Sequence, residues 1–201
     1  MTDNFALLNE PRRPWLEADL LKQKFLALSA DLHPDRIHSA SESDKIAATK
    51  KFTELNAAFN CLAEPKLRLL HLLELELGAK PKDIQTIPSA LADLFAEVSM
   101  ACHGADNFLV EKSKATSPLL QVQLFERGQN WVEQLNLLQK KMNELRGQVL
   151  TQLKSLDAKW ISTEANLRHK LLPNLEELYR LFGYFNRWSN QIQERVVQLS
   201  F

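Results

Sequence analysis

The stretch that decides the fold is residues 21–36, LKQKFLALSADLHPDR. Its apolar residues recur at steps of four, three and four: Leu21, Phe25, Leu28 and Leu32. This spacing predicts a helix of about four turns with one apolar face. Pro34 disfavours the helical conformation at the residue before it, so the helix ends there and a loop follows.

A second amphipathic helix is predicted after this loop. Ser41 and Asp44 stand three residues apart, which is a spacing typical of a helix start. The apolar positions that follow keep the helical spacing: Ala48, Phe52, Leu55, Phe59 and Leu62. Because each of the two helices has one apolar face, they can pack together as an antiparallel pair.

Two shorter helices complete the N-terminal block, residues 1–78. Pro65 suits the first turn of a leucine-rich helix, and Gly78 suits the position just after its end. A short opening helix is expected from three apolar residues near the N-terminus: Phe5, Leu7 and Leu8.

A polar stretch around Pro81 separates this block from the rest of the chain. We therefore expect a linker at residues 79–87 and a second domain at residues 88–201. The first helix of that domain has an apolar stripe of four residues: Leu91, Phe95, Val98 and Cys102. We expect it to end at residues 104–107, which begin with a glycine.

Two longer helices follow in the second domain. From about residue 118 to residue 160, apolar residues recur in a pattern that resembles a coiled-coil seam: Leu135, Leu138, Met142, Leu145, Val149 and Leu156. The last helix ends near Leu199, and Pro173 either starts it or kinks it. The chain is therefore predicted to be all-α, with the second domain an elongated three-helix bundle.

Composition excludes several classes of function. The chain has 201 residues, with 25 Lys and Arg against 25 Asp and Glu, so it lacks the cationic excess that nucleic-acid or acidic-membrane binding draws on. Two cysteines without a C-x-x-C spacing predict neither a disulfide framework nor a zinc ribbon. No apolar run is long enough to span a membrane, and the N-terminus lacks a signal-peptide pattern. We expect a cytoplasmic protein that binds neither nucleic acid nor membrane.

The tripeptide His33-Pro34-Asp35 carries the most specific chemistry. Pro34 makes the loop rigid, Asp35 offers a carboxylate that a partner's arginine can bind in a bidentate way, and His33 offers directional ring nitrogens. Proline and aspartate are also ordinary turn residues, so the tripeptide alone could be a simple turn. Its place between two apolar helices favours a binding loop.

These motifs, in this order, resemble a J domain. The resemblance covers about residues 4–77 and includes the opening helix, the two amphipathic helices and the tripeptide. More specifically, Asn56-Ala-Ala-Phe59, Glu64-Pro65, Arg68 and the segment Leu72-Leu73-Glu74-Leu75 resemble the HscB type of iron–sulfur cluster co-chaperone. Members of that family join an N-terminal J domain to a C-terminal three-helix bundle.

The resemblance implies two sets of binding residues. The J domain would stimulate the ATPase of a DnaK-type chaperone through a first set: His33, Pro34, Asp35, Arg36, Lys22 and Lys24. The bundle would hold the iron–sulfur scaffold protein through a second set on its first and last helices: Leu94, Phe95, Val98, Arg180 and Leu181. Within this set, Leu94 and Leu181 lie beside the apolar stripes, so we expect these two to be exposed.

No catalytic or metal-binding pattern accompanies these motifs. The sequence contains no P-loop, no G-x-S-x-G and no H-E-x-x-H, and Cys61, Cys102 and His103 match no metal-ligand spacing. We therefore expect a protein that is not an enzyme and needs no cofactor.

Two alternatives remain open at this point. The chain could be a J-domain co-chaperone with another client, since its long helices could hold a partner coiled coil. It could also be a structural protein that dimerises through the seam at residues 118–160 and keeps a J-like fold without chaperone activity.

Overall fold

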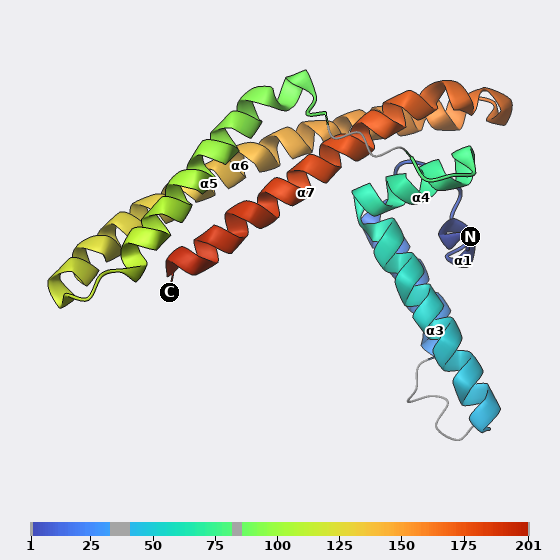
Figure 1. Ribbon diagram of the computed structural model, residues 1–201. Helices are drawn as coiled ribbons and strands as arrows, with labels where there is room; N and C mark the ends of the chain where they lie inside the picture. The colour runs from blue at the N-terminus through green and yellow to red at the C-terminus, as the bar shows by residue number, and fades with distance from the viewer. Residues whose placement is uncertain (1, 33–40, 82–85, 201) are drawn as a thin grey trace. The chain divides into compact units, whose positions relative to one another are not determined.

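The computed structural model describes residues 2–32, 41–81 and 86–200 (Figure 1). Within these residues all regular structure is helical, as the sequence predicts. The elements, in chain order, are α1 (Asn4–Leu7), α2 (Ala18–Ser29), η1 (Ala30–Leu32), α3 (Glu42–Ala63), α4 (Pro65–Leu77), η2 (Ser89–Leu91), α5 (Ala92–Ser113), α6 (Pro118–Ser162), η3 (Ala165–Leu171) and α7 (Leu172–Ser200).

The chain divides into two compact units. The first unit contains Met1–Lys82 together with Thr151–Tyr179, and the second contains Asp83–Leu150 together with Arg180–Phe201. Helices α6 and α7 therefore contribute residues to both units. The predicted domains follow the chain without such a split, and that division stays a prediction.

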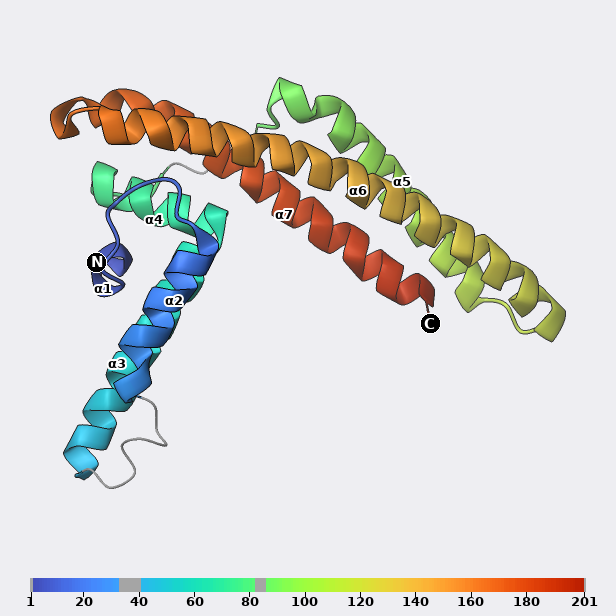
Figure 2. The same ribbon diagram turned by 180° about the vertical axis from the view of Figure 1, so that it is seen from behind.

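In the first unit, α2 and α3 lie side by side (Figure 2). The rings of Phe25 and Phe59 stack between them, with centroids 4.7 Å apart. Leu21 and Leu55 are almost fully buried. The Ser41 hydroxyl accepts a hydrogen bond from the Asp44 amide at the start of α3, so the predicted cap is confirmed.

Helix α4 begins and ends as the sequence predicts. Pro65 occupies its first turn, and the Glu64 carboxylate accepts a hydrogen bond from the amide of Leu67. Gly78 has a φ of +68° and donates its N–H to the carbonyl of Glu74. Glycine adopts this left-handed conformation without steric cost, which explains why the helix stops there.

The segment between α1 and α2 packs against the C-terminal part of α6, a contact that no local pattern predicts. Arg13 forms an ion pair with Asp157, whose exposed fraction is 3%. The amide of Trp15 donates to the same carboxylate, at 3.0 Å. The indole N–H of Trp160 donates to the carbonyl of Arg12, also at 3.0 Å. Residues 151–162 are thereby part of the first unit.

The second unit is built from α5 and from parts of α6 and α7. The predicted seam of α6 is buried inside the chain, since Leu135 and Met142 are at most 1% exposed. Gln139 on α6 donates to the Ser189 hydroxyl on α7. Pro173 lies in the first turn of α7, so it starts this helix rather than kinking it.

The predicted end of α5 at residues 104–107 is wrong, because the helix continues to Ser113. A Cβ atom at Gly104 would lie 2.3 Å from the Cη2 atom of Trp131 on α6. Gly104 therefore permits a close approach of the Trp131 ring to α5. We attribute the continued helix to this packing, which offsets the cost of glycine inside a helix.

Candidate functional site

The tripeptide and its neighbour, His33, Pro34, Asp35 and Arg36, lie outside the described residues. The elements on either side are described: η1 ends at Leu32 and α3 begins at Glu42. Element η1 directly follows α2, whose Phe25 ring stacks on Phe59 of α3. The role of the tripeptide as a binding loop stays a prediction.

The two lysines predicted to contact a chaperone differ in their surroundings. Lys24 donates to the carbonyl of Asn9 at 3.1 Å and forms an ion pair with Glu10 at 2.8 Å. Lys22 is exposed on α2 and has no ion-pair partner among the described residues. Lys22 is therefore available to a partner protein, whereas Lys24 holds the N-terminal segment against α2.

The predicted exposure of the scaffold-binding residues is wrong for two of them. Leu94 is 3% exposed and Leu181 is 8% exposed, so both are buried. Phe95, which the predicted stripe places in the core, is 41% exposed. Val98 is buried as its stripe predicts, and Arg180 is partly exposed.

The physical reason is an ambiguity of helical spacing. The true core stripe of α5 follows steps of three and four residues through Leu91, Leu94, Val98, Cys102, Ala105 and Phe108. Leu94 and Phe95 both fit between Leu91 and Val98, because steps of three and four are both helical. On α7, the buried stripe is wide because the helix contacts both α5 and α6, and it includes Leu181.

An aromatic cluster joins α5 to α7 in the second unit. Phe95 lies 6.0 Å from Trp188, and Tyr184 lies 5.4 Å from Trp188, measured between ring centroids. The guanidinium of Arg187 lies 5.9 Å above the Tyr184 ring. We call these four residues the α5/α7 face. Phe95 is its exposed apolar member, the buried ring of Trp188 packs against it, and Tyr184 in turn packs against Trp188.

Beside this face, α5 and α7 are linked by a polar clamp. Arg195 donates to the Asp106 carboxylate at 2.7 Å and to the carbonyl of Cys102 at 3.3 Å. A groove of about 260 Å³ runs between Phe95 and this clamp and includes His103. The sequence shows the aromatic residues of α7 but does not indicate which of them accompany Phe95.

The described parts of the chain contain neither a cluster of metal-binding side chains nor a helix that could span a membrane. No group of three or more His, Cys, Asp or Glu side chains there could hold a metal ion. Burial raises the pKa of the Cys61 and Cys102 thiols above the ordinary cysteine value, which disfavours the thiolate form.

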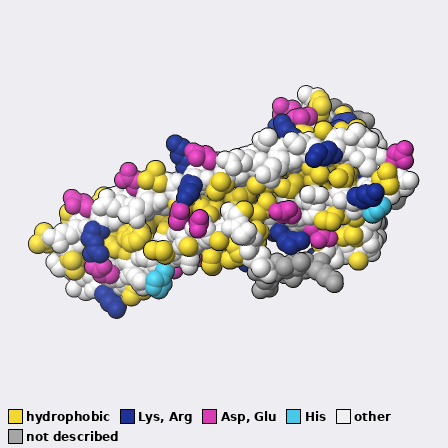
Figure 3. All heavy atoms as spheres, turned by 90° about the horizontal axis from the view of Figure 1, so that it is seen from above, with side chains coloured by type: hydrophobic (Ala, Val, Ile, Leu, Met, Phe, Trp, Pro, Cys, Tyr) yellow, Lys and Arg dark blue, Asp and Glu magenta, His cyan; other side chains and the backbone are white. Residues whose placement is uncertain are grey.

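No described helix is both long enough and apolar enough to span a membrane. On the face shown in Figure 3, positive and negative side chains are intermixed.

Comparisons with known proteins bear on this arrangement. No family model matches the chain. Two proteins from Vibrio cholerae serotype O1 strains, each named co-chaperone protein HscB homolog, are 35% identical to it over 72 residues. The match covers 36% of this chain and 42% of each relative, so it spans about two fifths of their length.

Solved structures extend the likeness to almost the whole chain. The chaperone HscB from Vibrio cholerae matches with a TM-score of 0.57 and 19% identity, over 96% of both chains. The human co-chaperone protein HscB matches with a TM-score of 0.59 and 17% identity, over 98% of this chain and 81% of the human one. The chain has the HscB fold. The predicted architecture, a J domain followed by a helical bundle, is thereby confirmed, as is the predicted resemblance to HscB-type co-chaperones.

In the HscB fold, the described helices belong to two parts of the chain. Helices α1–α4 form the J domain, whose paired helices α2 and α3 flank the tripeptide segment. Helices α5, α6 and α7 form the bundle, which carries the α5/α7 face.

Proposed function

We propose that this protein is a cytoplasmic co-chaperone of the HscB type, without catalytic activity of its own. It stimulates the ATPase of a DnaK-type chaperone and brings to it the scaffold protein on which iron–sulfur clusters are assembled. One observation supports this proposal above the others: a J domain with a His33-Pro34-Asp35 segment is joined to a three-helix bundle in the HscB fold.

The mechanism rests on proximity between two binding events. The J domain contacts the chaperone through residues 33–36, and the bundle holds the scaffold protein. Tethering both contacts to one chain makes the second binding event effectively intramolecular, which raises the local concentration of the client at the chaperone.

Lys22 is the better candidate for electrostatic attraction to the chaperone. Its ammonium group is exposed and has no described ion-pair partner, whereas that of Lys24 is bound to Glu10. An exposed lysine chiefly accelerates association with an acidic partner, and added salt weakens this effect. We therefore assign Lys22 to the chaperone contact and Lys24 to the internal structure of the J domain.

The scaffold contact is centred on Phe95 in this proposal. Exposed aromatic residues supported by further rings are common anchors of protein interfaces. Leu94, Val98 and Leu181 act indirectly, because they are buried beneath the surface of the bundle. The partly exposed Arg180 stays a proposed rim residue.

The α6 seam does not favour the alternative of a dimerising structural protein. Leu135, Met142 and Val149 are all less than 9% exposed within the chain itself. A partner coiled coil at this seam would first have to displace α5 and α7. The same burial also argues against a client that is held by this seam.

The test is the ATPase rate of the cognate DnaK-type chaperone with and without the scaffold protein. Wild-type protein is expected to raise the rate, and Asp35→Asn is expected to return it to the unstimulated level, because the carboxylate can no longer pair with an arginine. Asp19→Asn is the matched control, since Asp19 is exposed on α2 and is expected to leave the rate unchanged. Equal rates for wild type and Asp35→Asn would refute the proposed trigger.

A further inference from the structure

The second half of α2 presents an outer surface without charge. Leu26 is 54% exposed, and Ala27 beside it is exposed as well. Between Lys24 and Asp31 the sequence contains no charged side chain. Leu26 follows the buried Leu21 by five residues, which corresponds to about 140° round the helix. Leu26 therefore points away from the core of the J domain.

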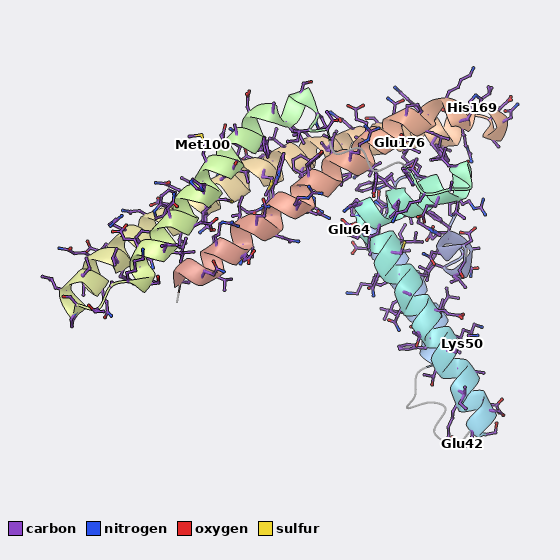
Figure 4. The ribbon with its side chains drawn as sticks, viewed as in Figure 1. Glu42, Lys50, Glu64, Met100, His169 and Glu176 are labelled. Carbon is purple, nitrogen blue, oxygen red and sulfur yellow. The ribbon has the colours of Figure 1, made fainter. Side chains whose placement is uncertain are left out.

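Helix α3, which packs beside α2, differs because its exposed positions carry charges. These charged residues include Glu42, Lys50, Lys51 and Glu54, and the first two are labelled in Figure 4. Charged side chains are usual on the solvent face of an amphipathic helix. Their depletion is instead typical of the buried core of a protein interface. The surface around Leu26 thus has the composition of a binding surface rather than that of a solvated helix face.

This uncharged surface is continuous with the proposed chaperone contact. Lys22 lies four residues before Leu26, so the two residues are about 40° apart round α2 and about 6 Å apart along it. Element η1 follows α2 directly and ends at Leu32, the residue before the tripeptide. Leu26 therefore shares a face with Lys22 and stands between Lys22 and the tripeptide in the sequence. The chaperone is the partner that this continuity favours.

We propose that Leu26 docks against an apolar patch of the DnaK-type chaperone, with Lys22 at the rim of that contact. This inference rests on the proposed function and adds the chemistry of the partner surface. A buried apolar contact chiefly slows dissociation, whereas a charge at the rim of an interface chiefly speeds association. Leu26 therefore determines how long the complex lasts, and Lys22 determines how fast it forms.

Stopped-flow binding of the full chain to the ATP-bound chaperone, at low and at high salt, tests this division. Leu26→Ala is expected to raise the dissociation rate constant about fivefold or more at both salt concentrations, with little change in the association rate constant. Leu26→Met keeps a large apolar side chain and should behave as wild type. Lys22→Ala should slow association at low salt and not at high salt, because salt screens exposed charges.

Two exposed residues elsewhere in the J domain provide matched controls. Leu67→Ala removes a leucine that is 43% exposed on α4, and Lys50→Ala removes an exposed lysine on α3. Both variants should keep the wild-type rate constants. The helical content of Leu26→Ala should also match wild type, since alanine has the highest helix propensity.

Two results would overturn the inference. One is an equal dissociation rate constant for Leu26→Ala and Leu67→Ala, which would leave the uncharged surface to another partner. The other is an effect of Leu26→Ala that disappears at high salt or that lies in the association rate constant, because the contact would then not be apolar.

The ATPase assay separates this inference from the proposed function. If Asp35→Asn abolishes stimulation and Leu26→Ala dissociates as wild type does, the co-chaperone function stands and the role of Leu26 falls. If Leu26→Ala dissociates faster and Asp35→Asn stimulates as wild type does, the Leu26 contact stands and the proposed trigger falls. A wild-type chain that does not bind the chaperone overturns both.

Discussion

At the scale of single residues, Arg68 shows how one buried cation organises the J domain. It is 3% exposed and donates to the carbonyl of Pro14 at 2.8 Å and to the carbonyl of Leu62. Its guanidinium also lies 5.8 Å from the centre of the Trp15 ring. Burial lowers its pKa to about 10, so it remains charged at neutral pH. Arg68 thereby joins α4 to the end of α3 and to the segment before α2.

Gly104 is a second residue whose identity matters. Gly104→Ala is expected to destabilise the protein by about 1–3 kcal/mol, because the added methyl group collides with Trp131, which must move. Gly147→Ala is the control, since a Cβ atom there meets nothing within 4 Å and alanine favours a helix by roughly 1 kcal/mol over glycine. The free energy of unfolding, measured in urea, should fall for Gly104→Ala and rise for Gly147→Ala. Stabilisation by Gly104→Ala would contradict the close packing.

His71 is expected to make stability depend on pH. It is buried, stacks on Phe5 and accepts the N–H of Asn4 at its Nε2 atom, at 3.0 Å. Burial lowers its pKa below the ordinary 6.5, although Asp3 and Glu74 oppose this and Arg12 supports it. The unfolded chain therefore binds a proton at a pH where the folded chain does not, so stability falls as the pH drops through 6.5.

The measurement for His71 is the free energy of unfolding at pH 7.5 and pH 5.5. His71→Gln keeps an acceptor for the Asn4 amide but cannot titrate, so its loss of stability on acidification should be smaller than that of wild type. His169→Gln removes an exposed histidine and should retain the wild-type pH dependence. Equal losses in wild type and His71→Gln would show that another group is responsible.

At the scale of elements, the sequence predicts helices well and their buried faces less well. The caps at Ser41 and Gly78 are local signals, and both are found where the sequence places them. The choice between Leu94 and Phe95 is not local, since it depends on where α6 and α7 lie. The continuation of α5 through Gly104 likewise depends on Trp131, which is 27 residues away in the sequence.

The burial of Leu94 and the exposure of Phe95 on α5 lead to a prediction about scaffold binding. Phe95→Ala is expected to weaken binding of the scaffold protein about tenfold or more while the helical content stays unchanged, because Phe95 is the exposed apolar member of the α5/α7 face. Leu94→Ala is expected to cost about 2–4 kcal/mol of stability instead, because it opens a cavity in the core.

Calorimetric titration and urea unfolding of both variants distinguish these outcomes. Leu137→Ala is a suitable control for binding, since Leu137 is 62% exposed on α6 and lies outside the α5/α7 face. The proposed site would be wrong if Leu137→Ala weakened scaffold binding and Phe95→Ala did not.

At the scale of the whole molecule, neither compact unit consists of one continuous stretch of chain. The first compact unit includes residues 151–179, and its link to the N-terminal segment joins Arg13 to Asp157, 144 residues apart. Sequence periodicity describes neighbours within one helix and contains no information on such a pair. A boundary drawn along the chain therefore separates residues that are packed together in the folded protein.

The Arg13–Asp157 pair is expected to stabilise the first unit as a whole. Asp157→Ala removes the acceptor of both the Arg13 guanidinium and the Trp15 amide, which leaves two donors unpaired. We expect a loss of about 3 kcal/mol, at the low end for a buried pair because the Arg13 side chain is 31% exposed and can be partly hydrated. Urea unfolding measures the loss of stability, and hydrogen exchange locates it in the structure. Amides of α2–α4 should exchange faster than in wild type, while those of α5 should not.

Glu111→Ala, which breaks the exposed pair with Arg127, should change neither measurement appreciably. If α2–α4 exchange as in wild type, then residues 1–82 hold together without α6, and the division of the chain at residues 79–87 is the physical one.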